Sequence, residues 1–196
     1  GRIENAEMAR LQNGHEEEIE RGMRALTKRL LDPMPKPAEL TSAQGNRLDH
    51  LAVALAWLRQ SVVRDRSGKR EISDLGSREG AGRLGKGLDM LARCHAGLFR
   101  QEECSEYDMA IAHRVAMDTV PHSRARVLSA IPLDAAMPGA EIVRLTGMLR
   151  TTVRWVTEEL EALGILLIGR DPAGNTYALS REFLEVWECC CKFEHK

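Results

Sequence analysis

Apolar residues recur at every third or fourth position along most of the chain, which is the spacing of one face of an α-helix. This pattern predicts helices over residues 15–31, 41–62, 83–98 and 103–120. The second has the longest apolar stripe: Leu48, Leu51, Leu55, Leu58 and Val62. The expected inner face of the third helix is Leu84, Leu88, Leu91, Cys94, His95 and Leu98. The expected inner face of the fourth helix is Met109, Ala112, Val115 and Ala116. A mostly helical first half follows from these stripes.

Turn and cap residues separate these helices. Pro33, Pro35 and Pro37 end the first helix and make a short linker, so residues 1–38 are expected to be a helix and a proline-rich linker. Thr41 or Ser42 is placed to cap the second helix, and Ser105 the fourth. Residues 64–82 are polar and rich in glycine, which predicts a loop or a short strand at its centre.

After Pro121 the pattern changes to shorter elements. Short helices are predicted over 122–131 and 140–147, and a longer one over 149–163 that buries Val153, Val156, Leu160 and Leu163 and ends at Gly164. Between them, "PLDAAMPG" is typical of turns. "ILLIGR" and "TYALS" predict two strands joined by the turn "DPAGN", before a last helix over 181–192.

Three short helices followed by a small hairpin resemble the winged helix-turn-helix family over residues 122–180, most specifically at "EIVRLTGMLRTTVRWVTEELEALGIL". In that family the third helix lies in the major groove of DNA and the hairpin wing contacts phosphates or the minor groove. The resemblance implies that DNA contacts come from the exposed start of helix 149–163 and from the wing. The candidates are Arg150, Thr151, Thr152, Arg154, Trp155 and Arg170. Arg at such positions can bind guanine with two hydrogen bonds, and Thr suits phosphates.

Two features of this region also fit a protein partner. Its six Arg residues are balanced by six Asp and Glu, so the region is neutral, and phosphate contacts dominate DNA affinity. Leu149 lies where related helices have a capping Ser or Thr, and Trp155 is apolar at an exposed position. Binding of a protein partner through Trp155 is therefore an alternative to DNA binding for this winged helix.

The preceding segment carries a second resemblance. "SREGAGRLGKGLDMLARCHAGLF", followed by "SEYDMAIAHRVAMDTVP", is similar to the helical lid of AAA+ ATPases of the minichromosome-maintenance kind. It implies a lid-like bundle over residues 39–120, in which Arg83 opens a helix and contacts the phosphate of a nucleotide held by a neighbouring domain. The other interpretation of Arg83 is that it simply begins a solvated helix.

No G-x-x-x-x-G-K-[ST] motif and no apolar run ending in Asp-Glu occurs in the sequence, so this chain is not expected to be an enzyme by itself. Binding of ATP and Mg²⁺ is expected only in a longer protein, at an ATPase domain upstream of Gly1. Because the chain begins at Gly1 in the middle of a pattern, we expect it to be a fragment.

Composition and charge exclude few of these functions. The net charge is −1, but residues 47–100 carry eleven Lys and Arg against six Asp and Glu, a local +5 that can hold DNA phosphates or nucleotide. Taken alone, Arg64–Arg70 is interpreted as a solvated loop. The sequence has no membrane-length apolar run, and its five cysteines are odd in number and poorly spaced for disulfides, so a cytoplasmic protein is expected.

Other candidate chemistry is set aside. Cys94 is predicted to pack in the core. The tail cysteines, Cys189, Cys190 and Cys191, and His195 lack the spacing of zinc ligands, so no metal site is expected, and no catalytic residue can be named.

The fold class expected is therefore mostly α: a helical bundle over 39–120, then a winged helix-turn-helix with a small β-hairpin wing over 121–181, then a helix and tail over 182–196. The function expected is binding of double-stranded DNA, as the C-terminal end of a larger bacterial or phage ATPase. The alternatives are a free-standing dimeric transcriptional regulator and a protein-interaction module.

Overall fold

The structure is a computed structural model, and it describes residues 18–29, 36–65, 70–172 and 174–190. The described part is mostly helical, with a small antiparallel sheet and a separate two-stranded hairpin. Residues 18–29 form the first helix, and its apolar side chains Ile19, Met23 and Leu26 are exposed. Leu30 and the linker residues Pro33 and Pro35, which the sequence placed at its end, lie outside the described residues.

The central helix, α2 (Ser42–Leu58), begins at a capping box. Thr41 is its N-cap: the Thr41 hydroxyl accepts from the Gln44 amide, and the Gln44 side chain accepts from the Thr41 amide. The predicted stripe is confirmed for Leu48, Leu51, Leu55 and Leu58, which are all buried. The prediction for Val62, the last residue of that stripe, is wrong, because Val62 lies in a strand and not in the helix.

The next helix, α3 (Ala81–Leu98), buries mainly small residues. Its buried residues are Gly85, Leu88, Ala92, Ala96 and Gly97. A Cβ on Gly97 would lie 2.5 Å from the Lys36 carbonyl oxygen, so the chain passes too close there for any side chain. The prediction is confirmed for Leu88, which is buried, and Leu84 and Leu91 pack half-buried against the core. Cys94 and Leu98 are exposed, and the prediction that Cys94 packs in the core is wrong.

The last helix of the bundle, α4 (Glu106–Asp118), has the predicted cap. Ser105 and Asp108 form a capping box, so the prediction for Ser105 is confirmed. Met109, Ala112 and Ala116 are buried as expected. The prediction for Val115 is wrong, because α4 buries only the narrow side that faces α2 and α3, and Val115 is exposed.

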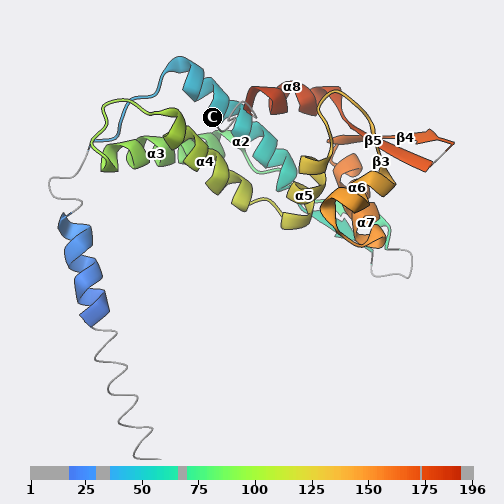
Figure 1. Ribbon diagram of the computed structural model, residues 1–196, viewed down its shortest axis with the longest axis horizontal. Helices are drawn as coiled ribbons and strands as arrows, with labels where there is room; N and C mark the ends of the chain where they lie inside the picture. The colour runs from blue at the N-terminus through green and yellow to red at the C-terminus, as the bar shows by residue number, and fades with distance from the viewer. Residues whose placement is uncertain (1–17, 30–35, 66–69, 173, 191–196) are drawn as a thin grey trace, which may run out of the picture.

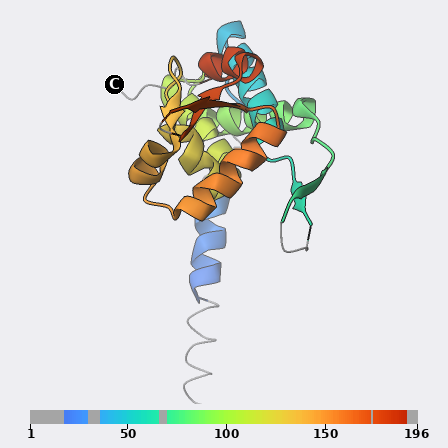
Figure 2. The same ribbon diagram turned by 90° about the vertical axis from the view of Figure 1, so that its right-hand side faces the viewer.

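The short strand predicted at the centre of residues 64–82 is present, and it pairs with a preceding strand, which was not predicted, to make a hairpin. Strands β1 (Val62–Arg64) and β2 (Ile72–Leu75) pair antiparallel, with Val62 opposite Leu75 and Arg64 opposite Ile72. This hairpin projects from the side of the helices (Figure 2).

The C-terminal part contains three helices and a three-stranded antiparallel sheet. In chain order its elements are α5 (His122–Ala130), β3 (Met137–Pro138), α6 (Gly139–Thr146), α7 (Arg150–Ala162), β4 (Leu166–Asp171) and β5 (Gly174–Leu179). The sheet order is β3-β5-β4. Strand β3 was missed, because it has two residues within a segment that was predicted to be a turn. Gly147 and Gly164 end α6 and α7 as predicted, with φ of +64° and +76°.

The last helix, α8 (Arg181–Cys190), joins the two halves of the molecule. It lies along α2 (Figure 1), where the Phe183 ring stacks between the rings of Trp57 and Trp187 at centroid distances of 5.6 and 5.5 Å. The buried residues form one hydrophobic cluster that runs from α2 to α8. The bundle and the C-terminal part therefore share a core, which fixes α7 relative to α2 and its hairpin.

Candidate nucleic-acid interface

One side of α7 is buried and the other is open. Val153, Val156 and Leu160 are buried as predicted. Arg150, Thr151 and Arg154 are exposed, and Thr152 is half-buried at the edge. The structure thus brings these four candidate residues together at the start of one helix.

The first turn of α7 has no side-chain cap. Its N-cap residue is Leu149, which is 75% exposed and offers no hydrogen-bond acceptor to the first amides of the helix. These amides carry the positive end of the helix dipole. An anion at this end would therefore meet unpaired N–H groups together with the Arg150 side chain.

The outer arginine of this helix has a nearby acidic partner. Arg154 Nε donates to Glu158 Oε1 at 2.8 Å, and the Arg154 side chain is 76% exposed. Because the pair is open to solvent, it contributes little to stability and can be exchanged for another anion.

The β1–β2 hairpin is held against α7 by Arg64. Its guanidinium donates to the Trp155 carbonyl oxygen at 2.8 Å and to Glu158 Oε2 at 3.2 Å, and its Nε lies 3.5 Å from Glu159 Oε1. The Arg64 side chain is only 16% exposed. The interpretation of Arg64 as part of a solvated loop is therefore wrong, because the carboxylates of α7 supply partners that its own segment does not.

Arg70, which precedes the second strand of the hairpin, covers the ring of Trp155. The guanidinium carbon lies 5.0 Å from the ring centroid, which is a cation–π contact. Trp155 is 39% exposed, so its ring is partly covered by Arg70 and does not project freely into solvent.

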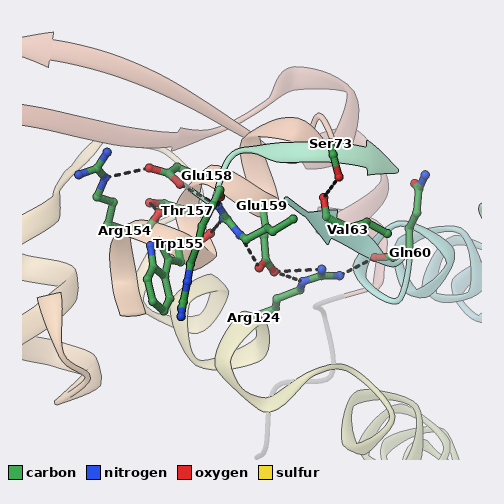
Figure 3. Close-up of polar contacts among 11 residues, drawn as sticks. Gln60, Val63, Ser73, Arg124, Arg154, Trp155, Thr157, Glu158 and Glu159 are labelled. Atoms are coloured by element: carbon green, nitrogen blue, oxygen red, sulfur yellow. Dashed lines mark hydrogen bonds and ion pairs between the residues drawn. The ribbon is translucent and has the colours of Figure 1, made fainter. Parts of the chain in front are cut away.

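A buried arginine ties α7 to the rest of the molecule from its inner side (Figure 3). Arg124 of α5 donates to Glu159 Oε2 through Nε and Nη2, at 3.1 and 3.0 Å. Its Nη1 donates to the carbonyl oxygens of Leu58 and Gln60 at 2.9 and 2.7 Å. Only 6% of the Arg124 side chain is exposed. This residue therefore links α5, α7 and the segment between α2 and β1.

The β4–β5 hairpin places Arg170 on the same side of the molecule as Arg154. Arg170 is exposed and pairs in register with Asn175. Both arginines line a hollow of about 600 Å³ between this hairpin and α7. A second hollow, of about 400 Å³, lies between α6, α7 and β5 and is lined by Arg150, Arg154, Gly139 and Tyr177 among others.

Arg83 belongs to a different part of the surface. It lies in the first turn of α3, its side chain is 84% exposed, and it is ion-paired with Glu79 at 2.6 Å. Arg83 is thus accessible to a partner outside this chain.

A second polar cluster joins α3 to α4. The carboxylate of Asp108 is buried and accepts from His95 Nδ1 at 2.6 Å and from the Ser105 amide at 2.7 Å. Burial alone would raise the pKa of Asp108, but the hydrogen bonds from Ser105 and His95 outweigh it and hold this pKa below its ordinary value. Ser105 touches the carboxylate and not the imidazole, so the cluster lacks the order of a nucleophile–base relay.

Sequence reasoning missed Arg124 and the partners of Arg64. Both had been counted only as charges, Arg124 in the neutral C-terminal part and Arg64 in the basic segment 47–100. A signal was present, since an Arg that replaces an apolar residue on an inner helix face predicts a buried ion pair. Its partner, Glu159, could not be read from the sequence because the two lie 35 positions apart.

Other chemistry is sparse in the described part of the chain. Within it, no three His, Cys, Asp or Glu side chains gather as metal ligands, and no helix is long and apolar enough to cross a membrane. Cys191 and His195 lie outside the described residues. Comparison of this chain with known protein families, with curated proteins and with solved structures finds no match.

Proposed function

We propose that residues 121–181 form a winged helix-turn-helix that binds double-stranded DNA through the N-terminal half of α7. The order of elements supports this proposal. Three helices are followed by a hairpin, and a short strand between the first two helices pairs with β5. In this interpretation α7 is the recognition helix and the β4–β5 hairpin is the wing.

The observation that carries the proposal is the position of Arg150 and Arg154. Both are exposed at the start of α7, beside uncapped helix amides, and Arg154 shares a hollow with Arg170 of the wing. Three arginines and the positive end of a helix dipole therefore face the same side, as contacts to phosphates and guanine edges require.

The charge balance of the region also supports DNA as the partner. The acidic residues of α7 that would repel phosphates are engaged by arginines: Glu159 by Arg124 and Arg64, and Glu158 by Arg64 and Arg154. Glu161, further along the helix, is exposed. Glu158 and Glu159 are therefore compensated within the protein, whereas Glu161 lines the hollow that holds Arg154 and Arg170.

The test is fluorescence anisotropy of a labelled duplex at two salt concentrations, with the wild type and with Arg150→Ala/Arg154→Ala. We expect the double variant to bind at least tenfold more weakly and to lower the slope of log K against log salt by about 2, since each lost phosphate contact removes about 0.9. The control is Arg114→Ala/Arg181→Ala. It removes the same charge, and Arg181 forms an i,i+4 pair with Glu185 like that of Arg154 with Glu158.

A protein partner is the second candidate, and the turn before α7 favours it. Leu145 and Leu149 are 50% and 75% exposed there, an apolar pair that a DNA surface does not need. Absence of wild-type binding to DNA at low salt would favour this candidate. A dimer that binds a palindromic duplex would favour a free-standing transcriptional regulator.

The role of Arg83 toward nucleotide stays a prediction. It requires an ATPase domain that is not among these residues, and what supports it is the exposure of the Arg83 side chain at the start of α3. In the proposed DNA complex Arg83 has no part.

A further inference from the structure

We propose that the β1–β2 hairpin is a second DNA-binding flank of α7, in which Arg70 contacts a phosphate and Trp155 holds Arg70 in position. This inference rests on the proposed function, because it assigns further contacts to the same complex. It also changes the role of Trp155, from a residue that contacts DNA or protein itself to a positioning residue.

The two hairpins lie on opposite sides of the outer face of α7. A hollow of about 740 Å³ between α7 and the β1–β2 hairpin is lined by Arg64, Arg70, Ile72, Arg154 and Trp155, among others. The hollow on the side of β4–β5 shares Arg154 and Glu158 with it. Arg154 therefore lies between a hollow that contains Arg70 and one that contains Arg170, and a duplex seated on α7 would pass both arginines.

The hairpin is anchored to α7 by Arg64. Its three contacts to Trp155, Glu158 and Glu159, and a further hydrogen bond from its Nη1 to the Arg70 carbonyl oxygen at 3.0 Å, fix both strands near the helix. These contacts engage the guanidinium nitrogens of Arg64. Arg70 is the exposed arginine that the anchor brings to the interface.

The cation–π contact between Arg70 and Trp155 suits a phosphate contact. A guanidinium that rests with its face on an aromatic ring keeps the N–H groups in its plane available as donors. Arg70 has a positive φ of 50°, so the backbone turns at this residue as it enters β2, and the Trp155 ring lies under its guanidinium. We infer that Trp155 reduces the number of conformations open to Arg70 before DNA binds.

Three carboxylates line the hollow, and the two that are not paired with Arg64 or Arg154 limit where the phosphate can lie. Glu71 and Glu161 also line the hollow and are exposed. A phosphate near either would be repelled, so the contact belongs to the part of the hollow bounded by Arg70 and Arg154. An acidic peptide would meet the same arginines, and the salt dependence on duplex DNA separates the two partners.

The experiment is a double-mutant cycle on duplex affinity with Arg70→Ala, Trp155→Ala and the combined variant, each at several salt concentrations. We expect Arg70→Ala to weaken binding by roughly 3- to 10-fold and to lower the salt slope by about 1. Trp155→Ala is expected to weaken binding less. The combined variant should equal Arg70→Ala, because Trp155 acts only through Arg70.

A matched control is available on the same segment. Arg78 stacks on Trp57 with its guanidinium carbon 4.7 Å from the ring centroid, a pair of the same kind that does not line the hollow. Arg78→Ala should leave the affinity and the salt slope unchanged. Arg70→Lys should retain the slope and lose the coupling to Trp155, since a lysine keeps the charge but not the planar stack.

The outcomes separate this inference from the proposed function. If Arg150→Ala/Arg154→Ala abolishes binding but Arg70→Ala leaves the salt slope unchanged, the proposed function stands and the second flank is wrong. If the effects of Arg70→Ala and Trp155→Ala simply add, Trp155 contacts the ligand itself and the positioning role is wrong. A wild type that binds no duplex overturns both.

Discussion

The two sides of α7 use the same pair of residue types for opposite purposes. On the inner side, Arg124 and Glu159 form an ion pair in which 6% and 22% of the side chains are exposed, and Arg124 also holds two carbonyl oxygens. On the outer side, Arg154 and Glu158 are 76% and 31% exposed. Burial, and not residue type, therefore decides whether an arginine stabilises the fold or is available to a partner.

The largest effect is expected on the inner side. Arg124→Met should lower the free energy of unfolding by about 3 kcal/mol, because it leaves the Leu58 and Gln60 carbonyl oxygens without their donor and leaves Glu159 with only its longer contact to Arg64. Urea unfolding followed by circular dichroism measures this loss.

The outer side supplies the control for this prediction. Arg154→Met should change the free energy of unfolding by about 0.5 kcal/mol or less. Adding Glu159→Gln to Arg124→Met should recover part of the loss, because the stranded charge is removed. Equal losses for Arg124→Met and Arg154→Met would show that the contrast between the two sides is wrong.

An intermediate effect is expected at the other buried charge, Asp108. Asp108→Asn should lower the free energy of unfolding by about 2 kcal/mol at pH 7, because one of the two carboxylate acceptors is lost and the hydrogen bonds from His95 and Ser105 are no longer charge-assisted. Asp118→Asn, exposed at the end of the same helix, is the matched control.

The pH dependence of this effect has a definite sign. The pKa of folded Asp108 lies below its ordinary value of 3.8, so its contribution is fully present above about pH 4 and is lost as the pH falls through the folded pKa. The difference in stability between wild type and Asp108→Asn should therefore shrink below pH 4. A difference that stays constant down to pH 2 would exclude the ionised carboxylate as its source.

The sequence was sufficient for features that depend on neighbours along the chain. The caps Thr41 and Ser105, the helix ends at Gly147 and Gly164, and the β4–β5 hairpin all follow from residues within a few positions of each other. The exposure of Arg150 and Arg154 also followed, because the period of a single helix fixes which side is apolar.

Features that depend on close packing between distant elements were not predicted. The end of α3 was predicted wrongly: Cys94 and Leu98 are exposed, and the close approach of the chain is at Gly97. Pairing of the β1–β2 hairpin with α7 depends on Arg64 and Glu158, which lie 94 positions apart. Periodicity carries no information about such pairs.

The smallest effect is expected at Glu158, the ion-pair partner of Arg154 on the outer side of α7. Glu158→Gln removes the anion that holds Arg154 but keeps the shape of the side chain. We expect the proposed DNA affinity to rise a few-fold, since Arg154 no longer has to exchange an internal partner for a phosphate, and the stability to fall by about 1 kcal/mol or less. Glu161→Gln removes the same charge from the same helix, where no ion pair with Arg154 is formed, so it measures the general effect of charge on affinity. A gain for Glu158→Gln beyond that of Glu161→Gln is therefore the release of Arg154. A loss of affinity would mean instead that Glu158 orients Arg154, or holds Arg64 and its hairpin in place, and the outer pair would then be as structural as the inner one.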